Sequence, residues 1–320
     1  MNVLLTSVGR RVALLRSFRR ELAALGPGRV LAADASALSA GFQDADGGFL
    51  VPPCTSPDYV PALLDLVRRE RVGLLVPLID PELEVLARAR ELFLREGCHP
   101  LVSDAATIAT SRDKRRSAER FRELGFDAPR VLGAEELERP EALSYPLFLK
   151  PADGSSSVGA LAIQDADELR FHLPRTRHAV VESLEAGEEF TVDVLADLQG
   201  RACCAVPRRR LEVRGGEISK GRTVKHPRII RESLRLVEAL GGCQGCITLQ
   251  CFLGPDERVS FFEVNARFGG GYPLSDAAGA NYPGWILRML AGERVPRLDG
   301  WEDGLVMLRY DDAVFVPGLG

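Results

Sequence analysis

Three polar side chains alternate with apolar ones in the stretch FFEVNARFGGG, which covers residues 261–271. Glu263, Asn265 and Arg267 are two residues apart, and side chains two apart on a strand leave the same face. Val264 and Ala266 would point to the other face. A polar row of this kind is costly to bury unless it has partners, so the stretch predicts a ligand-binding surface that ends at three glycines.

The chemistry that these residue types support is magnesium binding. Gln250 in TLQCF and Glu263 are expected on neighbouring antiparallel strands, with Asn265 one same-face step, about 6.5–7 Å, beyond Glu263. Oxygen ligands suit magnesium. Two ions about 3.5–4 Å apart could share the Glu263 carboxylate, with Gln250 and Asn265 on either side and nucleotide phosphates completing the shells. A strand with a chance polar face is the alternative.

A second stretch, PLFLKPADGSSSVGA, has the composition of a phosphate-binding loop. Lys150 ends an apolar strand and precedes Gly154, three serines and Gly159. Small residues let backbone N–H groups approach phosphate oxygens, and the lysine adds a point charge. A Walker motif would place the lysine after the glycines. Taken alone, the stretch is also compatible with an ordinary flexible turn.

Two further stretches are ambiguous by themselves. Lys114 in SRDKRRSAERF lies in the first turn of an expected helix that Asp113 or Ser111 could cap, and by itself it reads as a surface residue. In VESLEAGEEFTVDV, Glu182 ends one strand and Glu189 opens the next. Such a strand end can offer backbone groups to an adenine and a carboxylate to a ribose, or it can be solvated.

The elements that precede these residues alternate between short apolar runs and amphipathic helices over the first hundred positions. Helices are expected at 11–25, 57–70 and 81–96, between strands such as VLLT, RVLAAD and GLLVPLI. This order predicts a doubly wound parallel α/β sheet. The turn TSVGRR has one glycine where a dinucleotide fingerprint needs three. Asp34 could mimic the acidic ribose contact, but we favour a role in holding its own loop.

From Ser111 onward the pattern becomes α+β and mainly antiparallel. A hairpin turn is expected at Gly215 and Gly216, a helix at 226–240, and helical segments at 273–279 and 281–291. We therefore predict an N-terminal Rossmann-like domain over 1–105 and a second domain over 106–320. The second domain would comprise a small lid over about 112–186 and a C-terminal lobe over 187–320.

Composition narrows the class of protein. The chain has 320 residues, 46% of them hydrophobic, and a formal net charge of -4, which fits two cores and gives no overall field for nucleic acid or membranes. The seven cysteines are odd in number and irregularly spaced, as in a reduced cytoplasmic protein. One CxxC, Cys243 and Cys246, is weak support for a metal or redox role. We expect neither a targeting segment nor a membrane span.

These motifs together resemble the ATP-grasp ligases, in particular the single-module members of the carbamoyl-phosphate-synthase-large-subunit-like branch. The resemblance rests on DK at 113–114, FLKP at 148–151 with GSSSVG, VESLEAGEEFTVDV, LQCF and FFEVNARFGGGYPLSDAAG, in that order. The N-terminal VGRR and VPLIDPELE are similar to the pre-ATP-grasp domain of small members. The resemblance implies an ATP-grasp fold with two α+β lobes behind the parallel sheet.

The resemblance also implies roles for individual residues. Lys114 and Lys150 would contact ATP phosphates, Glu189 the ribose, and Arg267 the reacting carboxylate or the transferring phosphoryl group. Gln250, Glu263 and Asn265 would hold two Mg²⁺ ions, with Mn²⁺ as an alternative. The lid loop and the adenine-binding strand end would add Gly154, Ser155, Ser156, Ser157, Val158, Glu182, Ser183 and Leu184. Arg210 and Lys220 would face phosphates or substrate, and Ser275 the substrate's head group.

The implied activity is ATP-dependent joining of a carboxylate to an amine, or to a thiol, through an acyl phosphate with release of ADP. One module is too little to make carbamoyl phosphate alone, so a stand-alone ligase fits best, with a homodimer as one expected assembly. A non-catalytic or regulatory ATP-binding protein is the main alternative. An NAD-dependent oxidoreductase is the third.

Overall fold

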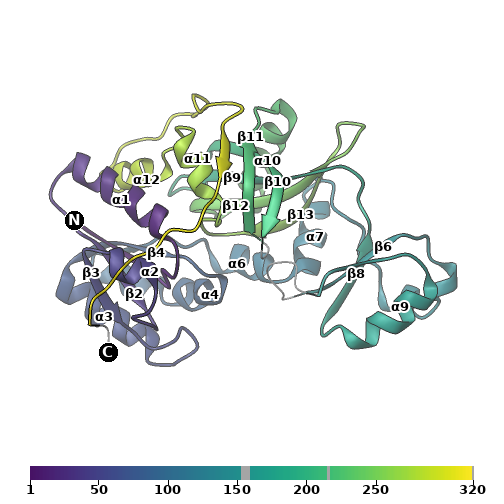
Figure 1. Cartoon of the computed structure of the whole chain (residues 1–320), viewed down its shortest axis with the longest axis horizontal. Coiled ribbons are helices and arrows are strands. Elements are labelled where there is room, and N and C mark those ends of the chain that lie inside the picture. Colours follow the sequence, from purple (N-terminus) through teal and green to yellow (C-terminus); the bar gives the residue numbers. More distant parts are fainter. Residues whose placement is uncertain (153–158, 215–216, 319–320) are drawn as a thin grey trace.

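The structure is a computed structural model that describes residues 1–152, 159–214 and 217–318. Figure 1 shows three sheet-centred parts along the long axis of the molecule. The predicted loop residues Gly154, Ser155, Ser156, Ser157 and Val158, and the hairpin turn at 215–216, lie outside the described residues. The strands on either side of that turn do pair with each other, from Arg214 and Glu217 onward.

The first part is the predicted doubly wound domain. Its five strands are all parallel, in the order β3-β2-β1-β4-β5. They are β1 (Asn2–Thr6), β2 (Val30–Asp34), β3 (Gly47–Leu50), β4 (Val72–Pro77) and β5 (His99–Pro100). The helices are α1 (Val12–Leu25), α2 (Ala40–Asp44), α3 (Tyr59–Glu70), α4 (Asp80–Arg88) and α5 (Arg90–Arg95). Leu5 and Leu4 enter separate cores on the two faces of the sheet, as expected when successive side chains alternate.

Two details of this domain differ from or refine the sequence prediction. The single helix expected at 81–96 is interrupted at Ala89, where α4 ends and α5 begins. Asp34 accepts hydrogen bonds from the backbone N–H of Gly9 at 2.9 Å and of Ser36 at 3.1 Å. Its carboxylate is therefore used to hold the β1–α1 turn against the end of β2, which is the structural role that we favoured.

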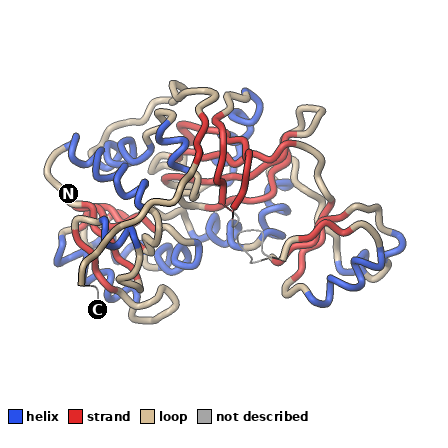
Figure 2. The backbone as a smooth tube through the Cα atoms, in the orientation of Figure 1, coloured by secondary structure: helices blue, strands red, loops and turns tan. Residues whose placement is uncertain are grey.

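The other two sheets are antiparallel throughout. The large sheet has the order β13-β12-β9-β10-β11-β14 and the small one β7-β6-β8. Figure 2 draws the strands of these sheets in red. The large sheet contains β9 (Glu188–Ala196), β10 (Ala202–Arg214), β11 (Glu217–Thr223), β12 (Gly245–Leu253), β13 (Val259–Asn265) and β14 (Val306–Leu308). The small sheet contains β6 (Leu147–Pro151), β7 (Leu161–Ile163) and β8 (Ala179–Ser183).

The helices of this half begin where capping side chains predict. Asp113 accepts hydrogen bonds from the N–H groups of Arg115 and Arg116, and His226 accepts one from Ile229. Asp113 thus caps α7 (Lys114–Glu123), and His226 caps α10 (Pro227–Leu240). The remaining helices are α6 (Ala105–Arg112), α8 (Ala134–Leu137), α9 (Ala166–His172), α11 (Tyr272–Ala277) and α12 (Tyr282–Leu290), with short 3₁₀ turns at Pro140–Ala142 and Leu173–Arg175.

The first domain and the large sheet share one hydrophobic core. The ring of Phe18 on α1 lies 5.9 Å from that of Phe268, which lies 4.8 Å from Tyr272. All three belong to a buried cluster that also contains Val3 of β1 and Tyr282 of α12. The small sheet instead has its own core, built around Leu149, Ile163 and Val181. The domain boundary at 105 and the lobe boundary at 186 stay predictions, and the core of the small sheet is confined to residues between Leu132 and Val181.

Candidate functional site

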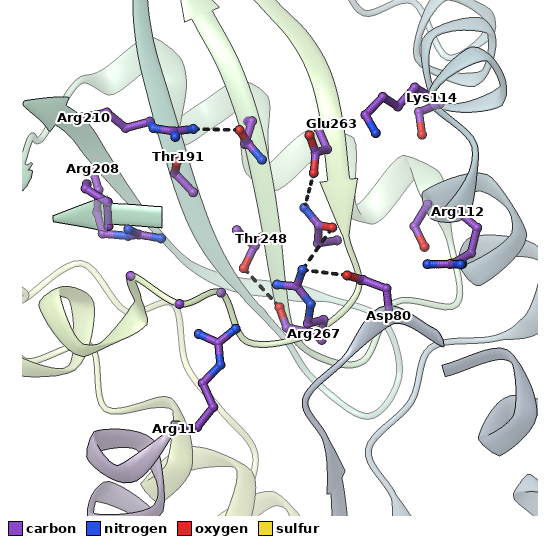
Figure 3. A pocket seen from close by; sticks show the side chains of 18 of the residues that line it. Arg11, Asp80, Arg112, Lys114, Thr191, Arg208, Arg210, Thr248, Glu263 and Arg267 are labelled. Carbon is purple, nitrogen blue, oxygen red and sulfur yellow. Dashed lines mark hydrogen bonds and ion pairs between the residues drawn. The ribbon is translucent and has the colours of Figure 1, made fainter. Parts of the chain in front are cut away.

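A pocket opens between the large sheet, the first domain and the start of α7 (Figure 3). The register of four neighbouring strands aligns a row of polar side chains along one wall of the pocket. Arg208 of β10 pairs with Thr191 of β9, Thr191 pairs with Gln250 of β12, and Gln250 pairs with Glu263 of β13. All four residues line the pocket. The row exists because each strand places one polar side chain at the same level of the sheet.

The predicted magnesium ligands lie together at one side of this row. Gln250 and Glu263 face each other across β12 and β13. A β-bulge at this point shifts the register by one residue, so that Cys251 then pairs with Phe261. The Asn265 amide donates to Glu263 Oε1 at 2.9 Å. Three oxygen-bearing side chains therefore converge, as the alternating sequence pattern predicted.

Arg210 joins this group from β10. Its Nη1 donates to Glu189 Oε1 at 2.5 Å and to Gln250 Oε1 at 3.0 Å. Burial raises the pKa of the Glu189 carboxyl, and Arg210 opposes that shift. The structure thus joins the predicted ribose residue, Glu189, and the predicted phosphate residue, Arg210, by hydrogen bonds to Gln250, one of the predicted metal ligands.

Lys114 and its neighbours approach the pocket from the opposite wall. Lys114 is the first residue of α7, and Ser111, Arg112 and Ser117 line the same wall. The Lys114 ammonium lies 3.5 Å from the carbonyl oxygen of Ala152, just before the predicted lid loop. The view in Figure 3 shows its side chain directed toward Glu263. The surface role that Lys114 suggests when considered alone is therefore not what the structure shows.

Lys150 and Glu182 form a buried ion pair in the small sheet. The Lys150 ammonium lies 2.5 Å from Glu182 Oε1, and both side chains are about 7% exposed or less. Burial raises the pKa of Glu182, and Lys150 opposes the shift. The same ammonium lies 5.7 Å from the ring centre of Phe262 on β13. The pair is thus positioned where the small sheet meets the large one, beside the pocket.

Arg267 connects the polar row to the first domain. Its Nη2 donates to Asp80 Oδ2 at 2.8 Å and lies 3.4 Å from Asn265 Oδ1. Its Nε is buried and has no hydrogen-bond partner among the described residues. A guanidinium that keeps an unsatisfied buried N–H at a pocket wall has a donor available for an anion.

Several pocket residues were missed by sequence reasoning. They are Arg11, Asp80, Arg112, Thr191 and Thr248. The three glycines expected to end the polar stretch, Gly269, Gly270 and Gly271, do line the pocket. Asp80 and Arg11 come from the first domain, at the starts of α4 and α1. The sequence does carry one signal for them, because both lie just after the carboxyl ends of parallel strands, where ligands of such sheets bind.

Some predicted residues are not brought to the pocket. Lys220 is half exposed and pairs with Glu212 at 2.6 Å, because a register shift between β10 and β11 places both on an outer surface. Ser275 is fully buried and donates to Asp193, so it cannot meet a substrate's head group. Ser183 ends β8 and accepts a hydrogen bond from the N–H of Arg130, and Leu184 follows the strand.

The pocket carries an excess of positive charge. Its lining includes six cationic side chains, Arg11, Arg112, Lys114, Arg208, Arg210 and Arg267, and two carboxylates, Asp80 and Glu263. Within the part of the chain that the structure describes, no group of three His, Cys, Asp or Glu residues could hold a metal ion alone. The oxygen donors Gln250, Glu263 and Asn265 fit a magnesium ion whose charge is balanced mainly by a polyphosphate. The cysteines are free thiols, and burial raises the pKa of Cys243 to about 12.

Comparison with known proteins places this architecture in a class. Residues 3–101 match the PylC-like N-terminal domain, residues 131–213 the D-Ala-D-Ala ligase C-terminus, and residues 176–312 the ATP-grasp in the biosynthetic pathway with Ter operon. A solved structure, the biotin carboxylase domain of Hydrogenobacter thermophilus 2-oxoglutarate carboxylase with MgADP, ADP and bicarbonate, aligns with a TM-score of 0.71. That alignment covers 91% of this chain and 70% of the other, at 18% identity, and so shows a shared fold.

Of two curated relatives, one is named as a ligase and the other as a resistance protein. The 3-methyl-D-ornithine–L-lysine ligase of Methanosarcina acetivorans is 36% identical over 98 residues, which are 31% of this chain and 24% of the relative. The vancomycin B-type resistance protein VanB of Enterococcus faecalis is 24% identical over 290 residues, covering 76% and 82%. The chain thus spans about a quarter of the first relative's length and most of the second's.

The fold and these matches define an ATP-grasp protein. The chain belongs to the ATP-grasp ligase family. Its placement in the carbamoyl-phosphate-synthase-like branch stays a prediction. In the described residues, helices long and apolar enough to cross a bilayer are absent.

Proposed function

We propose that this protein is an ADP-forming ligase that joins a carboxylate to an amine or thiol through an acyl phosphate. The single observation that carries the proposal is the pocket's arrangement. Lys114 and Arg210 flank the oxygen ligands Gln250, Glu263 and Asn265, and Arg267 lies beyond them with an unsatisfied buried Nε. The matches to D-Ala-D-Ala ligase and to an amino-acid ligase support it.

The cationic side chains would divide the pocket into a nucleotide end and an acyl end. Arg210 and Lys114 would hold the phosphates of ATP, and Lys150 with Glu182 would face the base and α-phosphate from the small sheet. Magnesium, held by Gln250, Glu263 and Asn265, would neutralise the developing charge on the transferred phosphoryl group. Arg267 would orient the carboxylate in line with the γ-phosphate, and this positioning supplies most of the rate.

Two displacements complete the proposed reaction. A carboxylate oxygen attacks the γ-phosphorus, the bond to the bridging oxygen breaks, and ADP leaves. The lone pair of the amine nitrogen then attacks the acyl carbon, the acyl–phosphate C–O bond breaks, and inorganic phosphate leaves while the nitrogen loses a proton. Fixed N–H donors at the acyl end stabilise the oxyanion of the second step.

The test is ADP and hydroxamate formation from ATP, Mg²⁺ and hydroxylamine across bicarbonate, the amino acids and common metabolite carboxylates. Hydroxylamine intercepts any acyl phosphate, so the natural amine need not be known. A carboxylate-dependent hydroxamate supports the proposal and names the acid. Tight ATP binding with neither product for any acid would overturn it in favour of a non-catalytic nucleotide-binding protein.

A further inference from the structure

Arg208 is a charged pocket residue without a role in the reaction proposed above. It lines the pocket, but its side chain is only 1% exposed. Its Nε donates to Asp193 Oδ2 at 2.8 Å and its Nη2 to Asp193 Oδ1 at 2.9 Å. This bidentate pair fixes the plane of the guanidinium.

Asp193 is itself held on several sides. The Ser275 hydroxyl donates to Oδ2 at 2.6 Å, and the Thr248 hydroxyl lies 3.4 Å from Oδ1. Tyr282 donates to the backbone carbonyl oxygen of Asp193 at 2.8 Å. Asp193 is fully buried and is not among the residues that line the pocket. It therefore acts on the pocket only through Arg208 and Thr248.

The remaining nitrogen of Arg208, Nη1, is directed toward the glycine loop. A Cβ placed on Gly271 would lie 2.0 Å from Nη1, so only glycine lets the loop run this close. Thr248 packs under the same loop, since a Cβ on Gly269 would lie 3.0 Å from its Oγ1, and that oxygen is 3.1 Å from the carbonyl oxygen of Arg267. No described residue accepts a hydrogen bond from Nη1.

A buried ion pair of this kind is a poor source of stability, because desolvation of both charges offsets their attraction. A well-packed apolar pair would serve the fold as well. Retaining a charged pair here leaves one oriented pair of N–H donors at the pocket wall. Such a preorganised donor costs no reorganisation when charge develops in front of it.

The position of Arg208 along β10 decides which end of the pocket it serves. Arg210 lies two residues further on, about 6.5–7 Å away on the same face, and contacts Gln250 and Glu189 at the nucleotide end. Arg208 lies toward the glycine loop that follows Arg267, as Figure 3 shows. The two arginines of β10 are therefore assigned to different parts of the reacting system.

We propose that Arg208 binds the acyl end of the substrate through Nη1, first the carboxylate and then the carbonyl oxygen of the acyl phosphate, opposite Arg267. Asp193 is then a positioning residue that holds this guanidinium in register. This assignment rests on the proposed function and adds to it a second arginine at the reacting carbon. The substrate class it specifies is an unhindered carboxylate that can lie between two guanidinium groups.

The experiment uses the paired variant Arg208→Met/Asp193→Asn, which removes both buried charges together and so avoids leaving either one uncompensated. Its matched control is Arg209→Met, because Arg209 is the next residue of β10 and pairs with Glu188 at the surface. Thermal melting checks folding, the ATP concentration dependence checks the nucleotide end, and hydroxamate formation checks the acyl end.

We expect the paired variant to melt near the wild type, to keep its KM for ATP within about threefold, and to lose about 100-fold or more in kcat/KM for the carboxylate. Arg209→Met should behave as the wild type. Wild-type-like carboxylate kinetics in the folded paired variant would overturn the assignment, and so would a parallel loss of ATP affinity. Should the pair fail to fold, Arg208→Lys keeps the buried charge but lacks the fork, and full activity in that variant would overturn the assignment as well.

A readout without turnover separates this inference from the proposed function. In the presence of MgADP, acetyl phosphate should raise the melting temperature of the wild type and of Arg209→Met but not that of the paired variant or of Arg208→Lys. An equal shift in all four proteins would exclude Arg208 from the acyl site. Absence of hydroxamate from the wild type, with the acetyl phosphate shift still dependent on Arg208, would instead count against the ligase reaction alone.

Discussion

Arg267 and Asp80 form an ion pair of 2.8 Å that joins the end of β13 to the first helical residue of α4. Their side chains are 15% and 20% exposed, so the contact lies at the edge of the pocket and not in the core. It links Arg267, the arginine that we propose to orient the carboxylate, to the N-terminal domain. The orientation of Arg267 is therefore set jointly by two domains.

Removing this link should slow catalysis more than it destabilises the protein. Asp80→Asn leaves Arg267 charged but less constrained, and we expect kcat to fall about tenfold, equivalent to about 1.4 kcal/mol in the activation barrier. Steady-state hydroxamate assays measure it. Asp276→Asn is the matched control, since Asp276 also crosses between domains, to Arg20 at 3.2 Å, but outside the pocket. Equal kcat values for both variants would contradict the role of Asp80.

Lys114 should matter for ATP and not for the carboxylate. Lys114→Met removes a pocket charge, and we expect the KM for ATP to rise about tenfold, or about 1.4 kcal/mol of binding, while the KM for the acid stays constant. Arg116→Met, on the exposed side of the same helix turn, provides the comparison. A larger effect on the acid than on ATP would remove Lys114 from the nucleotide end.

Glu263 is the only carboxylate in the proposed metal set. Glu263→Gln keeps an oxygen for the Asn265 amide but removes the negative charge, so we expect ADP release to fall at least about 100-fold, or about 2.7 kcal/mol. The Mg²⁺ concentration for half-maximal activity should rise as well. Glu119→Gln, on the exposed face of α7, controls for a lost surface charge. Near-normal turnover in Glu263→Gln would rule out the metal assignment.

The buried Glu82 predicts a pH effect on stability. Its carboxylate accepts from the Tyr59 hydroxyl at 2.5 Å and from the backbone N–H of Leu78 at 2.7 Å and Ile79 at 3.1 Å, and burial raises its pKa above the usual 4.5 despite these bonds. Between pH 4.5 and the raised native pKa, the folded state holds a proton that the unfolded state has lost. The free energy of unfolding therefore falls as pH rises through that window.

Glu82→Gln should remove this pH dependence. Urea unfolding of both proteins from pH 4.5 to 8 should show the variant gaining stability relative to the wild type as pH increases. A constant difference across the series would mean that Glu82 titrates alike in both states. Glu82 also holds the backbone of Leu78 and Ile79, directly before Asp80. The kcat of Glu82→Gln therefore tests whether the start of α4 must be held in place for catalysis.

Periodicity predicted the elements that are long and amphipathic. The helix expected at 226–240 is α10, with His226 as its cap, because its apolar spacing is regular and Pro227 suits a first turn. In contrast, α6 reads AATIATSR, whose small and β-branched residues give weak amphipathicity, and its start is set by Asp104 accepting from Thr107. A capping contact of that kind is local but easily overlooked. The short β14 depends on pairing with β11, which no local pattern encodes.

The candidate site was predictable where one strand carries its own pattern. Glu263 and Asn265 share a face by simple alternation, and Gln250 follows from antiparallel pairing with that strand. Lys220 was misplaced because the register between β10 and β11 shifts near Arg210, which turns its side chain toward Glu212. Asp80 and Arg11 come from a separate domain, and only the tertiary packing brings them to Arg267 and the glycine loop.

The aromatic contact between Phe18, Phe268 and Tyr272 limits how this protein can be recombined. Through these aromatic contacts, the first domain packs against the loop that carries Arg267 and the three glycines, within one continuous core. A chimera that exchanged residues 1–105 for those of a relative would therefore alter the geometry of the reaction centre as well as the outer wall of the pocket. We therefore expect a chimera to keep the geometry of the pocket only when α1, α11 and α12 are exchanged together.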